Sequence, residues 1–162
     1  MAETDQKLLI FALGAEGYGV SILKVKEIIG MLDITPVPRT PDFIKGVINL
    51  RGKIIPIMDL RMKFGMDQKE YDERTCIIVI EVNIHGAQKL LGVVVDMVSE
   101  VVTISQEQIE PPPEYGGAGL DHNFILGIGK IKDRVVIILD IEDVFMCEEV
   151  LKMLDSHQSI KE

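Results

Sequence analysis

The sequence predicts a mainly β protein made of two related small barrels, and three observations support this. Ile and Val contribute 23 and 16 of the 162 residues, whereas Trp is absent and aromatic residues make up 5%. β-Branched side chains favour strands because they are stiff and pack well on a pleated surface. The apolar runs are short and are separated by Gly, Pro and Asp turn residues. The order of these features also repeats along the chain.

The repeat is clearest where residues 43–64 match residues 124–145 at an offset of 81 without a gap. Upstream, residues 19–29 match residues 92–102 at an offset of 73. Any two strands rich in Ile and Val look alike, but matched Gly, Glu, Pro, Asp and Phe in one order favour a true duplication. We therefore expect two subdomains, 8–71 and 75–155, which together form one domain.

The first repeat is predicted to contain three strands, at 8–13, 18–22 and 25–29, with room for a helical turn at 21–24. Pro36, Pro38 and Pro41 lack the N–H of an interior ladder, so that stretch is expected at an edge or in a loop.

A hairpin and a short helix complete the first repeat. The hairpin joins 46–50 to 53–58 around Arg51 and Gly52, because Gly readily supplies the positive φ of a tight turn. Asp59 is a candidate N-cap for a short helix that Gly65 ends.

The second repeat is predicted to contain strands at 75–84 and 90–95 and a hairpin around Lys132 and Asp133. Its final helix begins at Asp140 and is longer than the first, because apolar residues continue at helical spacing. These residues are Val144, Cys147, Leu151 and Leu154. Five short strands per repeat suggest a small closed barrel, since closure removes exposed edges.

Composition argues against several classes of function. A net charge of −9 argues against a nucleic-acid binder, although a small barrel that binds oligonucleotides remains the alternative. The histidines, His85, His122 and His157, stand in no catalytic or metal-binding pattern, so we expect no enzyme, metal or cofactor. No signal peptide or membrane-spanning run is visible, which predicts a cytoplasmic protein that does not insert into the membrane.

Charge is unevenly distributed along the chain. Between Arg39 and Lys63 six basic and two acidic residues give a local balance of +4, so the remainder carries −13. Such a bipolar molecule suits docking against a complementary protein surface. Ordinary solvated strand faces would give the same composition.

Several segments resemble the CheW family of chemotaxis coupling proteins. They are EGYGVSILKVKEI at 16–28, ITPVP at 34–38, PDFIKGVINLRGKIIPIMDLR at 41–61, GVVVD at 92–96 and VSEV at 98–101. The likeness covers about residues 8–150, and the NLRG hairpin with FIKG upstream is its most specific part.

The resemblance implies two intertwined five-stranded barrels and a non-enzymatic scaffold without a cofactor. Its partners would be the cytoplasmic tips of methyl-accepting chemoreceptors and the regulatory domain of the histidine kinase CheA. The scaffold would lie in receptor arrays at the inner face of the membrane. The receptor tip would dock in the groove where the barrels meet, and the kinase-contacting residues stay unassigned. The implied receptor contacts are Val25, Glu27, Ile28, Asn49, Arg51, Val93 and Val94.

The chemistry of three of these residues can be weighed without the resemblance. Arg51 at a hairpin tip presents a planar fork suited to a carboxylate or to helix-end carbonyls, or is simply an exposed turn residue. Val25 and Ile28 fit core packing equally well, since alternate residues of a strand face inward. Glu27 is less ambiguous, because burial of a carboxylate without a partner is costly.

Overall fold

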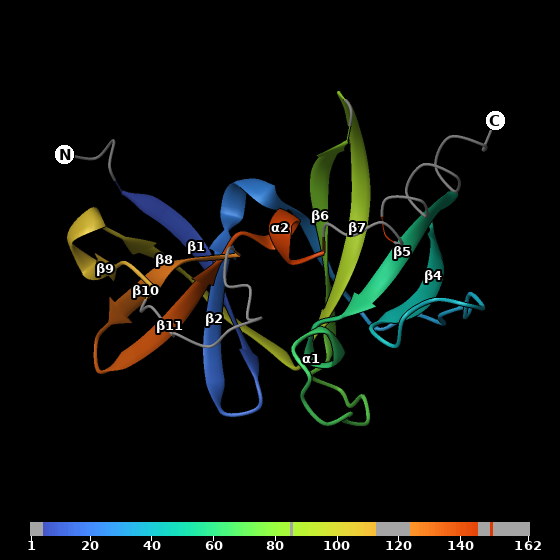
Figure 1. Cartoon of the computed structure of the whole chain (residues 1–162), viewed down its shortest axis with the longest axis horizontal. Helices are drawn as coiled ribbons and strands as arrows, with labels where there is room; N and C mark the ends of the chain where they lie inside the picture. Colours follow the sequence, from blue (N-terminus) through green and yellow to red (C-terminus); the bar gives the residue numbers. More distant parts are fainter. Residues whose placement is uncertain (1–4, 85, 113–123, 146–149, 151–162) are drawn as a thin grey trace, which may run out of the picture. The chain divides into compact units, whose positions relative to one another are not determined.

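The computed structural model describes residues 5–84, 86–112, 124–145 and 150 (Figure 1). Within these residues the chain forms two compact units. Unit 1 takes its residues from Met1–Leu23 and Val98–Phe145, and unit 2 takes its residues from Lys24–Met97 and Met146–Glu162. Each unit holds one β-sheet, and the helices are single short turns. The predicted mainly β fold is therefore confirmed.

Unit 1 contains a six-stranded sheet in the order β8-β1-β2-β11-β10-β9. Its core is a cluster of buried aliphatic side chains, Leu8, Ile10, Ile104, Ile131, Val136 and Ile138. The unit also contains the 3-10 turn η3 (Gln106–Gln108) and the helix α2 (Ile141–Val144). The strands are β1 (Gln6–Leu13), β2 (Glu16–Ser21), β8 (Met97–Ile104), β9 (Ile109–Glu110), β10 (Ile125–Ile131) and β11 (Arg134–Leu139).

Unit 2 contains a five-stranded sheet in the order β3-β6-β7-β5-β4. The 3-10 turn η2 (Ile22–Lys24) precedes β3, and the helix α1 (Leu60–Lys63) follows β5. The strands are β3 (Val25–Gly30), β4 (Ile44–Leu50), β5 (Lys53–Asp59), β6 (Cys76–Ile84) and β7 (Ala87–Val95). The core cluster comprises Ile48, Ile55, Ile57, Ile77, Val79 and Val94.

Two expectations about architecture need correction. Each sheet has two unjoined edges in its hydrogen-bonded order, so within the described residues neither sheet is a closed barrel, and unit 1 has six strands instead of five. The compact units also do not follow 8–71 and 75–155, because β2 pairs in parallel with β11 and β5 pairs in parallel with β7. Each parallel ladder joins a strand of one repeat to a strand of the other, so both units combine the two repeats.

The same local geometry recurs at the matched positions of the two repeats. The hairpins β4–β5 and β10–β11 each carry an irregularity, before Gly46 and before Gly127. The Asp59 N–H donates to the Phe43 carbonyl at 2.7 Å, and the Asp140 N–H donates to the Phe124 carbonyl at 2.7 Å. Both aspartates are helix N-caps, as predicted. These contacts support a duplicated structural unit.

Some sequence predictions fall where the structure gives no description. The extension of the last helix through Cys147, Leu151 and Leu154 lies outside the described residues, and the described helix α2 ends at Val144. The three histidines also lie outside them. Within the described ranges, no helix is both long enough and apolar enough to cross a lipid bilayer.

Asp59 holds together the start of α1 and the loop that follows it. Its side chain accepts a hydrogen bond from the Met62 N–H at 3.3 Å and another from the Tyr71 hydroxyl at 2.9 Å. Asp59 is buried, so the tyrosine satisfies a carboxylate that water reaches poorly. Burial, and then the neighbouring Asp59 carboxylate, raise the pKa of Tyr71 well above its ordinary value.

We expect this tyrosine to make stability fall at alkaline pH. Above about pH 10 the unfolded chain releases the Tyr71 proton while the folded chain keeps it, so the folded state loses stability as pH rises. Tyr71→Phe should cost about 1 kcal/mol at pH 8 through the lost hydrogen bond, and should show a weaker decline towards pH 11. Urea unfolding of both proteins at the two pH values measures this. Parallel declines would contradict it.

Candidate functional site

The tip of the β4–β5 hairpin presents Arg51 from a fixed backbone. Arg51 and Gly52 have φ values of 52° and 89°, the pair of positive angles that a two-residue type I′ turn requires. The Gly52 N–H donates to the Asn49 side-chain oxygen at 2.9 Å. Asn49 therefore holds the turn that carries Arg51, and this is the structural role visible for a residue implied as a receptor contact.

The Arg51 guanidinium forms an ion pair with the Glu27 carboxylate on β3. The two side chains are 69% and 31% exposed, so solvent screens their attraction. An exposed ion pair contributes at most about 1 kcal/mol. A partner that offers its own charged groups can therefore replace this pair at a small cost in free energy. Before the partner binds, the pair keeps both side chains oriented.

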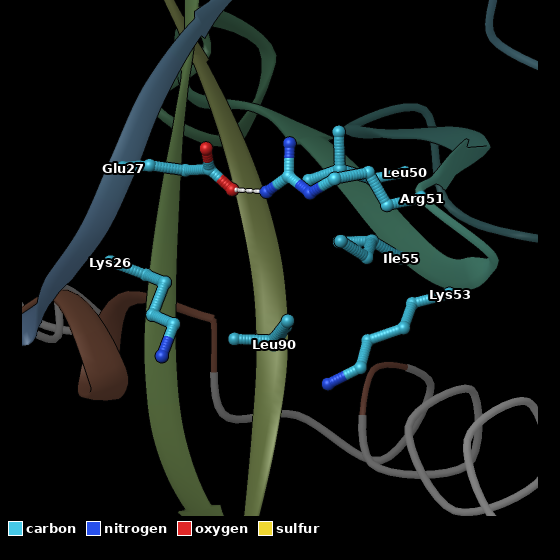
Figure 2. A pocket seen from close by; sticks show the side chains of 7 residues that line it. All are labelled: Lys26, Glu27, Leu50, Arg51, Lys53, Ile55 and Leu90. Atoms are coloured by element: carbon cyan, nitrogen blue, oxygen red, sulfur yellow. Dashed lines mark hydrogen bonds and ion pairs between the residues drawn. The ribbon is translucent and has the colours of Figure 1, made fainter.

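Beside this pair the surface of unit 2 has a hollow of about 230 Å³ (Figure 2). Leu50, Ile55 and Leu90 supply its apolar lining, and β3, the β4–β5 hairpin and β7 supply its walls. The charged groups around it are Lys26, Glu27, Arg51 and Lys53. Figure 2 shows Glu27 and Arg51 pointing toward each other, with Lys26 and Lys53 below this pair in the view.

A local irregularity in β3 explains why consecutive residues line the same hollow. Successive side chains of a regular strand point to opposite faces. The register of β3 against β6 shifts between Val25 and Glu27, as in a β-bulge, and both Lys26 and Glu27 line the hollow. The bulge therefore allows both Lys26 and Glu27 to line the hollow.

The structure brings together only part of the implied receptor contacts. Glu27 and Arg51 line the hollow, and Asn49 supports it from the turn. Neither Val25 nor Ile28 is among the described residues that line it. Ile28 is 41% exposed, whereas Val25 is partly buried on β3.

Val93 and Val94 require a correction. They are only 1% and 3% exposed, and Val94 belongs to the core cluster of unit 2. They lie in β7, which pairs on both sides, with β6 and with β5. Side chains with so little accessible surface pack the interior and cannot provide contact area to a partner. Their expected role as receptor contacts is therefore replaced by a role in the core.

Sequence reasoning missed Lys26, Leu50, Lys53, Ile55 and Leu90 as lining residues. Lys53 and Ile55 are two residues apart on β5, so their shared face could have been inferred from strand alternation. Leu90 comes from the second repeat and reaches the hollow through the parallel pairing of β5 with β7. Local sequence carries no signal for that pairing.

The basic cluster between Arg39 and Lys63 is partly neutralised inside the molecule. The Arg61 guanidinium donates to both Asp96 carboxylate oxygens, with Nε 2.9 Å from Oδ1, and to the Asp67 carbonyl. The Lys63 ammonium lies 4.5 Å from the centre of the Phe43 ring. Two of its six basic residues, Arg61 and Lys63, therefore make contacts within the molecule itself. Arg51 and Lys53 are the members of this cluster that line the hollow.

Unit 1 carries a similar pair. Glu100, which matches Glu27 in the repeat, accepts a hydrogen bond from Arg134 at 2.6 Å. Arg134 follows the β10–β11 turn, in which Lys132 has a φ of 55°. A glutamate on one strand and an arginine at a hairpin are thus a recurring arrangement, although the two arginines do not occupy matched positions.

The structure gives no support to the oligonucleotide-binding alternative. Among the aromatic residues that the structure describes, only Tyr71 is exposed, and its hydroxyl donates a hydrogen bond to Asp59. Base stacking requires accessible aromatic faces. In the same part of the chain, no group of three or more His, Cys, Asp and Glu residues could hold a metal ion.

Comparisons with known proteins agree with one another. The model of the CheW-like domain matches residues 7–149. The chain is 46% identical over 145 residues to the chemotaxis protein CheW of Klebsiella aerogenes, covering 90% of this chain and 84% of that one. It is 32% identical to the chemotaxis protein CheW of Treponema pallidum, covering 94% and 91%.

A solved structure shares the fold. The scaffolding protein TtCheW from Thermoanaerobacter tengcongensis superposes with a TM-score of 0.76 at 38% identity, covering 89% of this chain and 94% of that one. The family model spans nearly the whole chain, the relatives match over most of their own lengths, and the fold agrees. The chain therefore belongs to the CheW family of chemotaxis coupling proteins.

Proposed function

We propose that this chain is a non-enzymatic cytoplasmic scaffold that couples the cytoplasmic tips of chemoreceptors to the regulatory domain of the histidine kinase CheA. The family is one of non-catalytic adaptors that join receptors and CheA in chemotaxis. A scaffold of this kind needs surfaces that recognise other proteins, and needs no catalytic group. Membership of the receptor arrays at the inner face of the membrane follows from the same proposal.

The observation that carries the proposal is the exposed Glu27–Arg51 pair beside an apolar hollow. A receptor tip is a helical hairpin, and an amphipathic helix binds through apolar anchors in a groove. The apolar side chains of the hollow supply affinity, and charges at its rim fix the orientation of the helix. Unit 2 by itself provides both the apolar side chains and the charged groups.

We propose that Glu27, Arg51 and the exposed Ile28 contact the receptor tip. Asn49 acts through the turn, since its side chain holds Gly52. Val25 contributes to the same strand without lining the hollow. This surface is smaller than the set of residues that the resemblance implied, because Val93 and Val94 are interior.

Reconstitution tests the proposal directly. CheA autophosphorylation is measured with receptor-containing membranes, in the presence and absence of the purified chain. We expect the chain to raise receptor-dependent autophosphorylation severalfold, and to co-sediment with membranes only when receptor is present. Equal kinase activity in both samples, together with no co-sedimentation, would contradict the coupling function.

A further inference from the structure

We propose that the hollow on unit 2 selects a partner helix that places a carboxylate opposite Lys53, one helical turn from an aliphatic side chain seated on Leu50, Ile55 and Leu90. This inference rests on the proposed scaffold function and specifies the chemistry of the segment that the hollow accepts. Lys53 becomes a specificity-determining residue, distinct from the Glu27–Arg51 pair.

The volume of the hollow fits one apolar side chain. It measures about 230 Å³, and a cavity of about 150 Å³ is enough to admit a benzene molecule. The side chains of Leu50, Ile55 and Leu90 consist of carbon and hydrogen, so the occupant that gains most from contact with them is aliphatic or aromatic. The seat is therefore apolar, and selectivity must come from the charged rim.

Lys53 is the rim cation that forms no ion pair with any of the described residues. Arg51 is paired with Glu27, and the Lys26 ammonium lies 3.4 Å from the Glu81 carboxylate. No carboxylate of the described residues forms an ion pair with Lys53, which is exposed on the first position of β5. The complementary group on the partner is thus a single negative charge next to the apolar anchor.

A helical partner meets this requirement with a short motif. Residues four apart lie on the same face of a helix, so a Leu at one position and a Glu at the fourth residue after it point toward one surface. The Leu fills the hollow while the Glu reaches the ammonium. A Lys at the same position faces Lys53 with like charge, which disfavours that partner.

Two designed helical peptides test the proposal. They are identical except that the fourth residue after the central Leu is Glu in one and Lys in the other. The probe is the NMR shift of the Leu50, Ile55 and Leu90 methyl groups of the full chain during titration. We expect the Glu peptide to shift these signals and to bind about fivefold more tightly than the Lys peptide.

Charge reversal at Lys53 gives the decisive comparison. Lys53→Glu should invert the preference between the two peptides, whereas Lys7→Glu, the same change at an exposed position of β1 in unit 1, should leave it unaltered. Equal binding of the two peptides, an unchanged preference in Lys53→Glu, or no shift of the three residues with either peptide would each overturn the inference. Kinase reconstitution is a separate readout, so loss of peptide selectivity with normal coupling rejects this inference alone.

Discussion

Arg51→Glu is expected to weaken binding of a chemoreceptor-tip fragment about thirtyfold while leaving the chain folded. The residue is exposed at a hairpin tip, so its replacement removes no core contact. Loss of a central arginine at a protein interface costs about 2 kcal/mol of binding free energy, which corresponds to this change in affinity. Isothermal titration with the fragment measures the affinity, and thermal unfolding verifies the fold.

The ion pair with Glu27 allows contact to be separated from structure. The double variant Arg51→Glu with Glu27→Arg exchanges the two charges and preserves their attraction. If Arg51 contacts the receptor directly, the double variant stays weak, because the charges now stand in reversed positions. If the pair only stabilises unit 2, the double variant regains wild-type affinity, and the proposed contact is rejected.

Gly46→Ala should destabilise the fold by at least about 3 kcal/mol. Gly46 has a φ of 142°, and a Cβ there would lie 2.1 Å from the Thr35 carbonyl oxygen. That oxygen accepts a hydrogen bond from the Val47 N–H at 2.9 Å, so the added methyl group forces apart the backbone bridge between the two segments. Strained φ and overpacking each contribute about 1–3 kcal/mol. Urea unfolding monitored by circular dichroism measures the loss.

Gly127→Ala is the matched control in the second repeat. The same β-carbon would meet the Ile109 side chain at 2.7 Å and the Glu110 carbonyl oxygen at 2.9 Å, so the clash is less severe and partly against a movable side chain. We expect a smaller loss, of about 1–2 kcal/mol. A loss at Gly127 equal to that at Gly46 would show that backbone strain is not the dominant cost.

The sequence was sufficient to predict the elements but not their partners. The strand-forming runs, turn residues such as Gly52 and the cap at Asp59 act within a few residues of chain, and these predictions were confirmed. The parallel pairings of β2 with β11 and of β5 with β7 join residues far apart in sequence, and no local pattern encodes them. The spacing of apolar residues along the sequence therefore could not predict that strands of the two repeats pair with each other.

The same reasoning explains the errors at the site. Arg51 and Glu27 could be weighed from their chemistry, because a guanidinium fork suits a carboxylate and burial of a carboxylate without a partner is costly. In the structure they pair with each other. Val93 and Val94 were assigned as receptor contacts only by the resemblance. Their own residue pattern could not correct the assignment, because a run of valines looks the same in a buried central strand as in a strand with one open face. The two kinds of strand differ in their neighbours, and these are set by the long-range pairing of β7 with β5 and β6.

The division of the chain between the units also has a consequence for its synthesis. The strands of unit 2 lie within one continuous stretch, Lys24–Met97, whereas β2 of unit 1 pairs with β11, which emerges from the ribosome more than a hundred residues later. Contacts that are distant along the chain form late, because a long loop must close first. The sheet of unit 2 is thus expected to form during translation, while the β2 edge of unit 1 waits until β11 has emerged. During that interval the β2 edge is a natural target for a chaperone.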